Sequence, residues 1–257
     1  MPIHTTAVVE SGARVDPSCD VGPLAYVGPH VTLGPRCVLG PHAVVTGHTT
    51  LGADNRVFSH AVIGEVPQDL KYSGEPTRVE IGNGNTFREF VTINAGTVQD
   101  RSVTSIADGC LFMASSHVGH DCVIGNRAII ANSVGISGHV LVEDDVHVGG
   151  ISGVHQFVRV GKLSFVGGLT GVVMDVAPYC TVNGPRAELA GLNVVGLQRS
   201  GMGEEAIGRV KQAYKIVFRS GLVLAEALAQ LRSEMGQHPE IAHLIAFLES
   251  SKRGVTR

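Results

Sequence analysis

Aliphatic side chains recur at every sixth position along most of this chain. Three registers of this kind run from Ile3 to Ile63, from Ile81 to Ile93 and from Ile106 to Val172. An amphipathic helix would space apolar residues three and four apart, and a half-buried strand would alternate them every two. One aliphatic residue per six, with small, polar or turn-forming residues between, instead predicts a short strand and a corner in each hexapeptide.

Three such hexapeptides make one turn of a triangular prism, so equivalent positions recur every eighteen residues. Stacked parallel strands lie about 4.8 Å apart, and each coil advances the prism by roughly that distance. Fixed-period repetition marks a solenoid, in which each coil buries its apolar side against its neighbours. A β-sandwich with glycine-rich turns is the alternative, but it would not hold one register over so many hexapeptides.

Two segments break the repeat, and the carboxy-terminal part abandons it. We expect insertion loops near 65–78 (EVPQDLKYSGEPTR) and 97–104 (TVQDRSVT), because neither can continue the hexapeptide pattern. Apolar residues have helical spacing over 204–219 and beyond, and Pro239 can open a last helix. The predicted organisation is a parallel β-helix over 1–177 and a helical domain over 178–257.

Composition narrows the possible classes of function. The chain has 33 Gly, no Trp and a formal charge of -3, which suits a narrow aliphatic core and gives no sign of nucleic-acid binding. We find neither a signal peptide nor an apolar run long enough to span a bilayer. Five scattered cysteines without a CxxC pair favour reduced thiols and a cytoplasmic protein.

Histidines gather on one edge of the prism once the eighteen-residue spacing is applied. The strings SHVGHD, VGISGH and VHQF fall on successive coils and place His120 and Asp121 below Gly138 and His139. Histidine suits general-base work because it titrates near neutrality, and a neighbouring carboxylate fixes its tautomer. The backbone N–H of Gly138 can face a developing oxyanion. We expect this group to be functional, although any single histidine among the 12 is better explained as a surface residue.

Three clustered histidines also admit a metal interpretation. Trimeric carbonic anhydrases built on the same prism hold zinc in this way, so a zinc-dependent lyase is an alternative. The helical tail and the first insertion loop argue against it. We therefore expect neither a metal nor another cofactor.

Five strings carry a resemblance to a known family: IGEVPQDLKYSGEPTRVEIG (63–82), HVGHDCVIGNR (117–127), SGHVLVEDD (137–145), GGISGVHQF (149–157) and AYKIVFRSG (213–221). Together they resemble the UDP-N-acetylglucosamine O-acyltransferases that begin lipid A biosynthesis. The resemblance implies a left-handed parallel β-helix and transfer of an R-3-hydroxyacyl chain from acyl carrier protein to the 3-hydroxyl of UDP-N-acetylglucosamine. It also implies a homotrimer with active sites between neighbouring prisms.

The resemblance assigns roles by position. His120 resembles the general base, Asp121 its partner and Gly138 the oxyanion donor, with no covalent acyl-enzyme. The other matching positions are Gln68, Asp69 and Lys71 for gripping the sugar and the acyl donor; His117, His139, His155 and Gln156 for substrate and phosphopantetheine contacts; Asn193 and Arg199 for the nucleotide; and Phe165 and Gly168 for the acyl pocket.

Three positions depart from the family pattern. Val195 replaces a usual acidic residue, Ser200 a common second arginine, and Asn94 a histidine. These changes leave open how the uridine diphosphate is held and whether the acceptor carries a 3-hydroxyl or a 3-amino group.

Two further expectations concern partners and catalysis. Basic residues of the helical tail can receive the acidic acyl carrier protein, although each can equally be a solvated residue. They are Arg209, Lys211, Lys215 and Arg219. A trimer that binds a nucleotide sugar without turnover is a second alternative to the acyltransferase.

Overall fold

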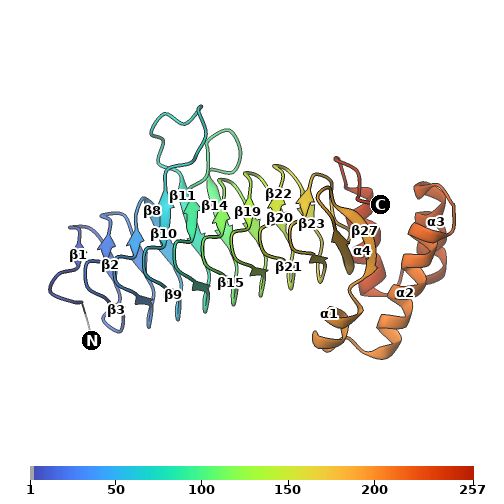
Figure 1. The fold of residues 1–257 in the computed structure, drawn as a ribbon, viewed down its shortest axis with the longest axis horizontal. Coiled ribbons are helices and arrows are strands. Elements are labelled where there is room, and N and C mark those ends of the chain that lie inside the picture. Colours follow the sequence, from blue (N-terminus) through green and yellow to red (C-terminus); the bar gives the residue numbers. More distant parts are fainter. Residues whose placement is uncertain (1–2) are drawn as a thin grey trace.

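The chain winds into a long parallel β-helix that ends in a group of helices (Figure 1). The structure, a computed structural model, describes residues 3–257. Within them, short parallel strands stack into three sheets that form the sides of the prism. The predicted fold class, a left-handed parallel β-helix followed by helices, is confirmed.

Each turn of the prism contributes one parallel strand to each sheet, and the third sheet ends in one additional strand that pairs antiparallel with its neighbour. The first sheet contains β1 (Val8–Val9), β4 (Tyr26–Val27), β7 (Val44–Val45), β10 (Val62–Glu65), β13 (Thr92–Asn94), β16 (His117–Val118), β19 (Gly135–Ile136), β22 (Gly153–Val154) and β25 (Gly171–Val172). The second contains β2 (Arg14–Val15), β5 (Thr32–Leu33), β8 (His48–Leu51), β11 (Arg78–Ile81), β14 (Val103–Ile106), β17 (Val123–Ile124), β20 (Leu141–Val142) and β23 (Arg159–Val160). The third contains β3 (Asp20–Val21), β6 (Val38–Leu39), β9 (Arg56–Val57), β12 (Thr86–Phe87), β15 (Leu111–Phe112), β18 (Ile129–Ile130), β21 (His147–Val148), β24 (Phe165–Val166), β26 (Cys180–Asn183) and β27 (Glu188–Leu192).

The repeat residues form vertical ladders inside the prism. Val118 pairs with Ile136 and Ile136 with Val154, as the eighteen-residue spacing predicts. Insertions do not disturb the ladder, because Ile93 pairs with Val118 across the second one. All four side chains are buried. Burying such a side chain contributes about 1.5–3 kcal/mol, so the stability of this narrow prism comes from the sum over its coils.

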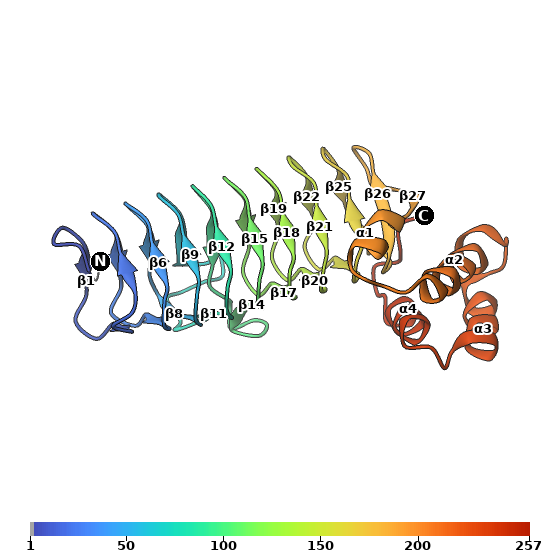
Figure 2. The same cartoon turned by 90° about the horizontal axis from the view of Figure 1, so that it is seen from below.

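Both insertions leave the prism at the same edge, where the first sheet passes to the second. The first occupies residues 66–77, between β10 and β11, and the second occupies residues 95–102, between β13 and β14. Figure 1 shows the two loops standing side by side above the prism, and Figure 2 shows the same fold from below. The two breaks in the repeat therefore share one location in space, close to the bounds expected for them.

Four helices follow the strands: α1 (Val194–Arg199), α2 (Glu204–Arg219), α3 (Leu224–Met235) and α4 (Pro239–Glu249). They enclose a second apolar core against the last coils of the prism. At this junction the guanidinium of Arg159 lies 4.1 Å from the ring centre of Phe247 and donates to Ser250 Oγ at 3.0 Å. A boundary at residue 177 groups β26 and β27 with the helices, although β26 hydrogen-bonds to β24 of the third sheet.

Among residues 3–257, no helix combines the length and the apolar character that crossing a bilayer requires.

Candidate active site

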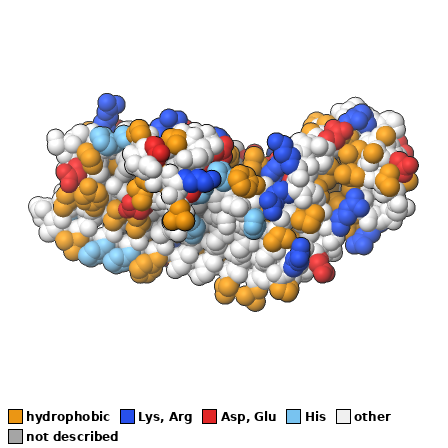
Figure 3. All heavy atoms as spheres, turned by 90° about the horizontal axis from the view of Figure 1, so that it is seen from above, with side chains coloured by type: hydrophobic (Ala, Val, Ile, Leu, Met, Phe, Trp, Pro, Cys, Tyr) orange, Lys and Arg blue, Asp and Glu red, His pale blue; other side chains and the backbone are white. Residues whose placement is uncertain are grey.

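One edge of the prism holds most of the predicted site. We call it the histidine edge and define it by the turns at residues 120–121, 138–139 and 156–157, which follow the two insertion loops along the same line. Figure 3 shows this side of the molecule hollowed between the bulk of the loops and the helical part. The predicted residues on this edge are His120, Asp121, Gly138, His139, His155 and Gln156.

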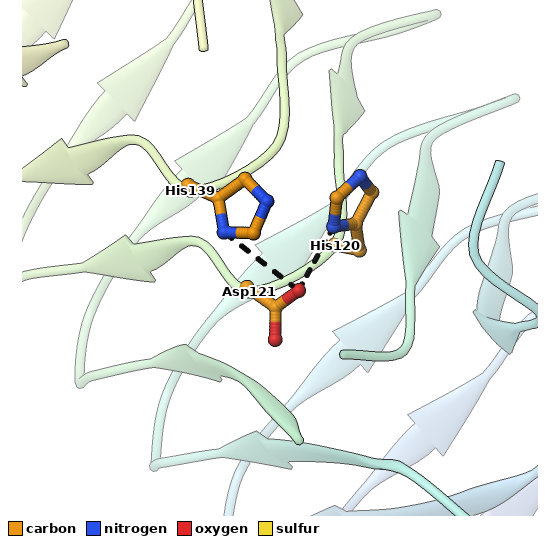
Figure 4. Close-up of side chains that lie close together, drawn as sticks. All are labelled: His120, Asp121 and His139. Atoms are coloured by element: carbon orange, nitrogen blue, oxygen red, sulfur yellow. Dashed lines mark hydrogen bonds and ion pairs between the residues drawn. The ribbon is translucent and has the colours of Figure 1, made fainter. Parts of the chain in front are cut away.

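His120 and Asp121 form a hydrogen-bonded pair. His120 Nδ1 lies 2.9 Å from Asp121 Oδ2, and only 15 % of the imidazole is exposed (Figure 4). Asp121 stands at a corner with φ of 60° and is buried. A carboxylate on Nδ1 leaves Nε2 as the ring nitrogen that can accept a proton. The predicted partnership of these two residues therefore exists in the folded chain.

The second insertion loop supports Asp121 from below. The backbone N–H of Thr97 donates to both carboxylate oxygens at 2.9 and 3.0 Å, and its hydroxyl donates to Oδ2 at 2.6 Å. The N–H of Asp121 in turn donates to Thr104 Oγ1 at 2.9 Å. Hydrogen bonds satisfy a buried carboxylate that would otherwise be costly to desolvate. They also fix the direction from which Asp121 holds His120.

His139 lies one coil above this pair and contacts both of its members. Its ring meets that of His120 edge to face, with centres 4.8 Å apart, and stacks flat on Phe157 at 4.3 Å. Its Nδ1 lies 2.7 Å from Asp100 Oδ2 and 3.9 Å from Asp121 Oδ2. The site thus contains two imidazoles and two carboxylates within contact distance.

Gly138 leaves the space that the His120 ring occupies. A β-carbon at this position would lie 2.6 Å from both Cε1 and Nε2 of that ring, closer than any real contact. Among residues 3–257, no acceptor takes the Gly138 N–H. Glycine is therefore required by the packing of His120 as well as being available for the oxyanion role expected of it.

His117 flanks the pair on the first sheet. Its Nδ1 lies 2.8 Å from Thr92 Oγ1. Burial, reinforced by the nearby His120, lowers the pKa of His117, which favours its neutral form. His155 and Gln156 are exposed farther along the edge, where the His155 ring contacts the Gln156 carbonyl at 3.1 Å.

Among residues 3–257, no hydrogen bond or ion pair joins the predicted residues of the first insertion loop to the histidines. Gln68 and Lys71 are exposed, and the Asp69 carboxylate accepts the Lys71 N–H within the loop at 2.9 Å. The buried Asn94 holds the base of this loop by donating to the Val66 carbonyl at 2.9 Å. The departure from histidine at position 94 thus serves to anchor the loop.

Another group of predicted residues gathers on the third sheet. Phe165, Asn193 and Arg199 line a groove of about 530 Å³, together with Val195 and Ser200. Asn193 caps α1, because its Oδ1 accepts the Gly196 N–H at 3.0 Å, while its Nδ2 donates to the Leu163 carbonyl at 2.9 Å. The third sheet lies opposite the histidine edge, so a single chain does not bring this groove to His120.

Gly168 lies apart from both groups, at the turn from the third sheet back to the first. A β-carbon there would lie 3.3 Å from the Gly150 carbonyl oxygen. Phe165 and Gly168, predicted to line one acyl pocket, therefore occupy a face and an adjoining edge of the prism.

Sequence reasoning missed several participants. Thr97 and Asp100 belong to the second insertion, where counting by eighteen does not identify the neighbouring residues. The polar composition of the segment was the only signal that it could be functional. Phe157 could have been found, because it lies eighteen residues after His139. His147, which lines the groove of the third sheet, also escaped notice; burial lowers its pKa.

Comparison with known proteins identifies the class of the fold. The pattern of the family described as bacterial transferase hexapeptide (six repeats) matches residues 104–138, which include His120 and Asp121. The pattern described as Udp N-acetylglucosamine O-acyltransferase, Domain 2, matches residues 175–256. Part of the prism therefore matches the hexapeptide repeats of bacterial transferases.

Relatives over the full length give the family. An acyl-[acyl-carrier-protein]--UDP-N-acetylglucosamine O-acyltransferase of Anaeromyxobacter sp. (strain Fw109-5) is 66 % identical over 257 residues, all of both chains. One of Myxococcus xanthus (strain DK1622) is 52 % identical over 99 % of each. The crystal structure of UDP-N-acetylglucosamine O-acyltransferase from Moraxella catarrhalis RH4 matches with a TM-score of 0.97, 43 % identity and complete coverage of both chains. The chain belongs to the UDP-N-acetylglucosamine O-acyltransferase family and is an acyltransferase, as its sequence motifs indicated.

The packing at Gly138 generates a first prediction. Gly138→Ala keeps the backbone N–H but adds a methyl group where the His120 ring lies, so the ring must shift from the position in which Asp121 holds it. A displacement of about 1 Å can lower a rate about 100-fold. We expect a loss of acyltransferase activity of that order, measured at steady state.

Gly208→Ala in α2 is the matched control, because among the described residues nothing lies within 4 Å of the added β-carbon. It should retain activity. Unchanged activity of Gly138→Ala would show that the His120 ring has another productive position.

Proposed function

We propose that this chain transfers an R-3-hydroxyacyl group from acyl carrier protein to the 3-hydroxyl of UDP-N-acetylglucosamine, the first step of lipid A biosynthesis. The observation that carries the proposal is the pair of His120 and the buried Asp121, whose hydrogen bond leaves Nε2 free to accept a proton. The names of the full-length relatives support these substrates.

The reaction follows from this pair. Nε2 of His120 takes the proton of the sugar hydroxyl as its oxygen attacks the thioester carbonyl carbon. The carbonyl oxygen becomes an oxyanion, which accepts the N–H of Gly138. When the C–S bond breaks, the imidazolium returns its proton to the departing phosphopantetheine thiolate. Asp121 stabilises the imidazolium between the two transfers, and no bond forms between the acyl group and the protein.

A homotrimer explains the separation of the predicted residues. The histidine edge and the groove of Phe165, Asn193 and Arg199 lie on opposite sides of one prism, and a rigid β-helix cannot fold one onto the other. In a closed trimer the edge of one chain faces a neighbouring chain. The exposed Gln68 and Lys71 would then reach substrates bound between two copies.

The same arrangement assigns the remaining roles. His117, His139, His155 and Gln156 contact the sugar nucleotide and the phosphopantetheine, and Asp69 contacts the sugar. The groove residues Asn193 and Arg199 bind the nucleotide, and Phe165 with Gly168 limits the acyl chain. The alternative acceptor, a 3-amino analogue of the sugar, would use the same base. An assay that offers both acceptors with a series of thioesters separates these cases by product mass.

The acyl carrier protein and the cellular location are part of the proposal. Lys211 and Lys215 are exposed on α2 and can receive an acidic protein. Arg209 is less available, because it pairs with Glu240 at 2.6 Å, and Arg219 stacks near Tyr214. We place the enzyme in the cytoplasm, where acyl carrier protein thioesters are made.

We also propose that the chain has two domains, the β-helix over 1–177 and the helical domain over 178–257.

One observation favours a different function. Ligand atoms of His120, Asp121 and His139 all lie within 4.8 Å of one another, close enough to hold the metal ion that a metal-dependent lyase would need. A candidate metal-ligand atom of this group is already engaged in hydrogen bonds, since Asp121 Oδ2 accepts from His120 and Thr97. A metal would have to displace these bonds.

The metal alternative gives a second prediction. Dialysis against a strong chelator should leave acyl transfer unchanged, with less than one equivalent of zinc per chain by elemental analysis beforehand. Loss of transfer on chelation, restored by added zinc, would establish the metal site instead.

Replacement of the proposed base gives a third prediction. His120→Ala should lower transfer from acyl carrier protein about 10²–10⁴-fold, the usual contribution of a general base, with an unchanged circular dichroism spectrum. His42→Ala is the control, since His42 stacks on His60 at a different edge. Full turnover by His120→Ala would reject the base, and a wild-type protein that binds the sugar nucleotide without turnover would favour the non-catalytic trimer.

Mixing of variants tests the shared site and gives a fourth prediction. His120→Ala and Arg199→Ala should each be poorly active alone. If the edge and the groove of one site come from two copies, unfolding and refolding the two variants together should restore intact sites and part of the activity. No recovery in mixed trimers, verified by differently tagged chains, would place both residues of one site in a single chain.

A further inference from the structure

Asp100 gives the second imidazole of the site a carboxylate of its own. It lies in the loop 95–102, and its Oδ2 is 2.7 Å from His139 Nδ1. The His139 side chain is only 14 % exposed, while 39 % of Asp100 remains accessible. The site therefore has two imidazole–carboxylate pairs. Both members of the pair His120–Asp121 lie on a regular coil, whereas the pair His139–Asp100 takes its carboxylate from the insertion loop.

The packing of His139 leaves one feature undetermined. Phe157 stacks on the ring with an interplanar angle of 5°, and His120 meets it at 90°. These contacts fix the plane of the imidazole. A half-turn about the Cβ–Cγ bond keeps that plane and exchanges the positions of Nδ1 and Cδ2, so apolar packing alone cannot select between the two orientations. A hydrogen-bond acceptor beside Nδ1 is needed for that.

Asp121 is poorly suited to be that acceptor. Its Oδ2 lies 3.9 Å from His139 Nδ1, beyond hydrogen-bond distance, and already accepts from His120 at 2.9 Å. If His139 turned to Asp121, the two imidazoles would compete for one oxygen. Asp100 removes this competition because it holds Nδ1 of His139 from the solvent side.

The loop links the two pairs. Thr97 donates to Asp121, and the Asp100 N–H donates to the Thr97 carbonyl at 3.2 Å. The base of the loop is tight, since a β-carbon on Gly96 would lie 2.2 Å from the Val103 nitrogen. The segment that orients Asp121 thus also sets the position of Asp100.

We infer that Asp100 is a positioning residue for acyl transfer: it holds the Nδ1–H of His139, so that Nε2 of His139 is the ring nitrogen presented to the bound substrates. This inference rests on the proposed function for its effect on rate, although the orientation of the ring is a property of the resting protein. Asp100 itself touches no reacting atom.

The test compares two substitutions in two backgrounds. Asp100→Ala removes the acceptor and should lower kcat/KM about tenfold, the lower end expected for a hydrogen bond to a charged group. Asp100→Asn keeps an oxygen that can accept from Nδ1–H and should restore most of that loss. In a His139→Ala background, Asp100→Ala should change kcat/KM by less than about twofold, because its target is gone.

Gln99→Ala is the matched control, an exposed neighbour in the same loop. Equal losses from Asp100→Ala in both backgrounds would show that Asp100 only supports the loop and would overturn the inference. So would an Asp100→Ala enzyme as active as wild type.

A second measurement does not depend on activity. In protein labelled with ¹⁵N-histidine, the imidazole signals of His139, identified by their loss in His139→Ala, should show a protonated Nδ1 in wild type and a changed proton distribution in Asp100→Ala. Identical signals in the two would overturn the inference. An Asp100-dependent tautomer in a protein without transfer would support the inference and reject the proposed function.

Discussion

The structure depends on one constraint, the parallel hydrogen bonding of each coil to the next around a column of aliphatic side chains. Because a strand contributes one inward residue, the position of Ile136 above Val118 determines where every other residue of that coil lies. The chain cannot slip by one residue without moving its apolar set to the surface. Chemistry on such a scaffold must therefore be built from one or two residues per coil along a single line.

The corners convert this regularity into side-chain geometry. Asp121, His139 and Phe157 stand at successive turns with φ of 60°, 63° and 65°, the left-handed region that residues other than glycine rarely enter. Each such residue costs of order 1–3 kcal/mol and persists only where its surroundings determine its conformation. Here the coils above and below do so, since the His139 N–H donates to the His120 carbonyl at 2.9 Å. Equal backbone conformations aim the three side chains in parallel, which brings the His139 ring flat against Phe157.

The same constraint decides which features the sequence predicts and which it does not. The period of six predicts the sheets and the core, and counting by eighteen places His120 beneath Gly138. The same counting fails across an insertion, so the contact of Thr97 with Asp121 had no signal beyond a polar segment. The sequence also did not predict that Asn193 caps α1. Asn193 matched a nucleotide-binding position, but its side chain also accepts a hydrogen bond from a free backbone N–H at the start of the helix.

Rigid winding also explains why insertions accompany the histidines. Most backbone groups in the coils directly above and below an edge carboxylate are already used in the ladder, so regular winding leaves few donors free for it. The loop 95–102 leaves the ladder and is free to direct the Thr97 N–H and hydroxyl at Asp121. A buried carboxylate needs such donors to replace the hydrogen bonds that water would otherwise give it. The interruption of the repeat thus supplies the donors that hold this acid–base pair on a regular edge, and the regular coils keep the pair in place.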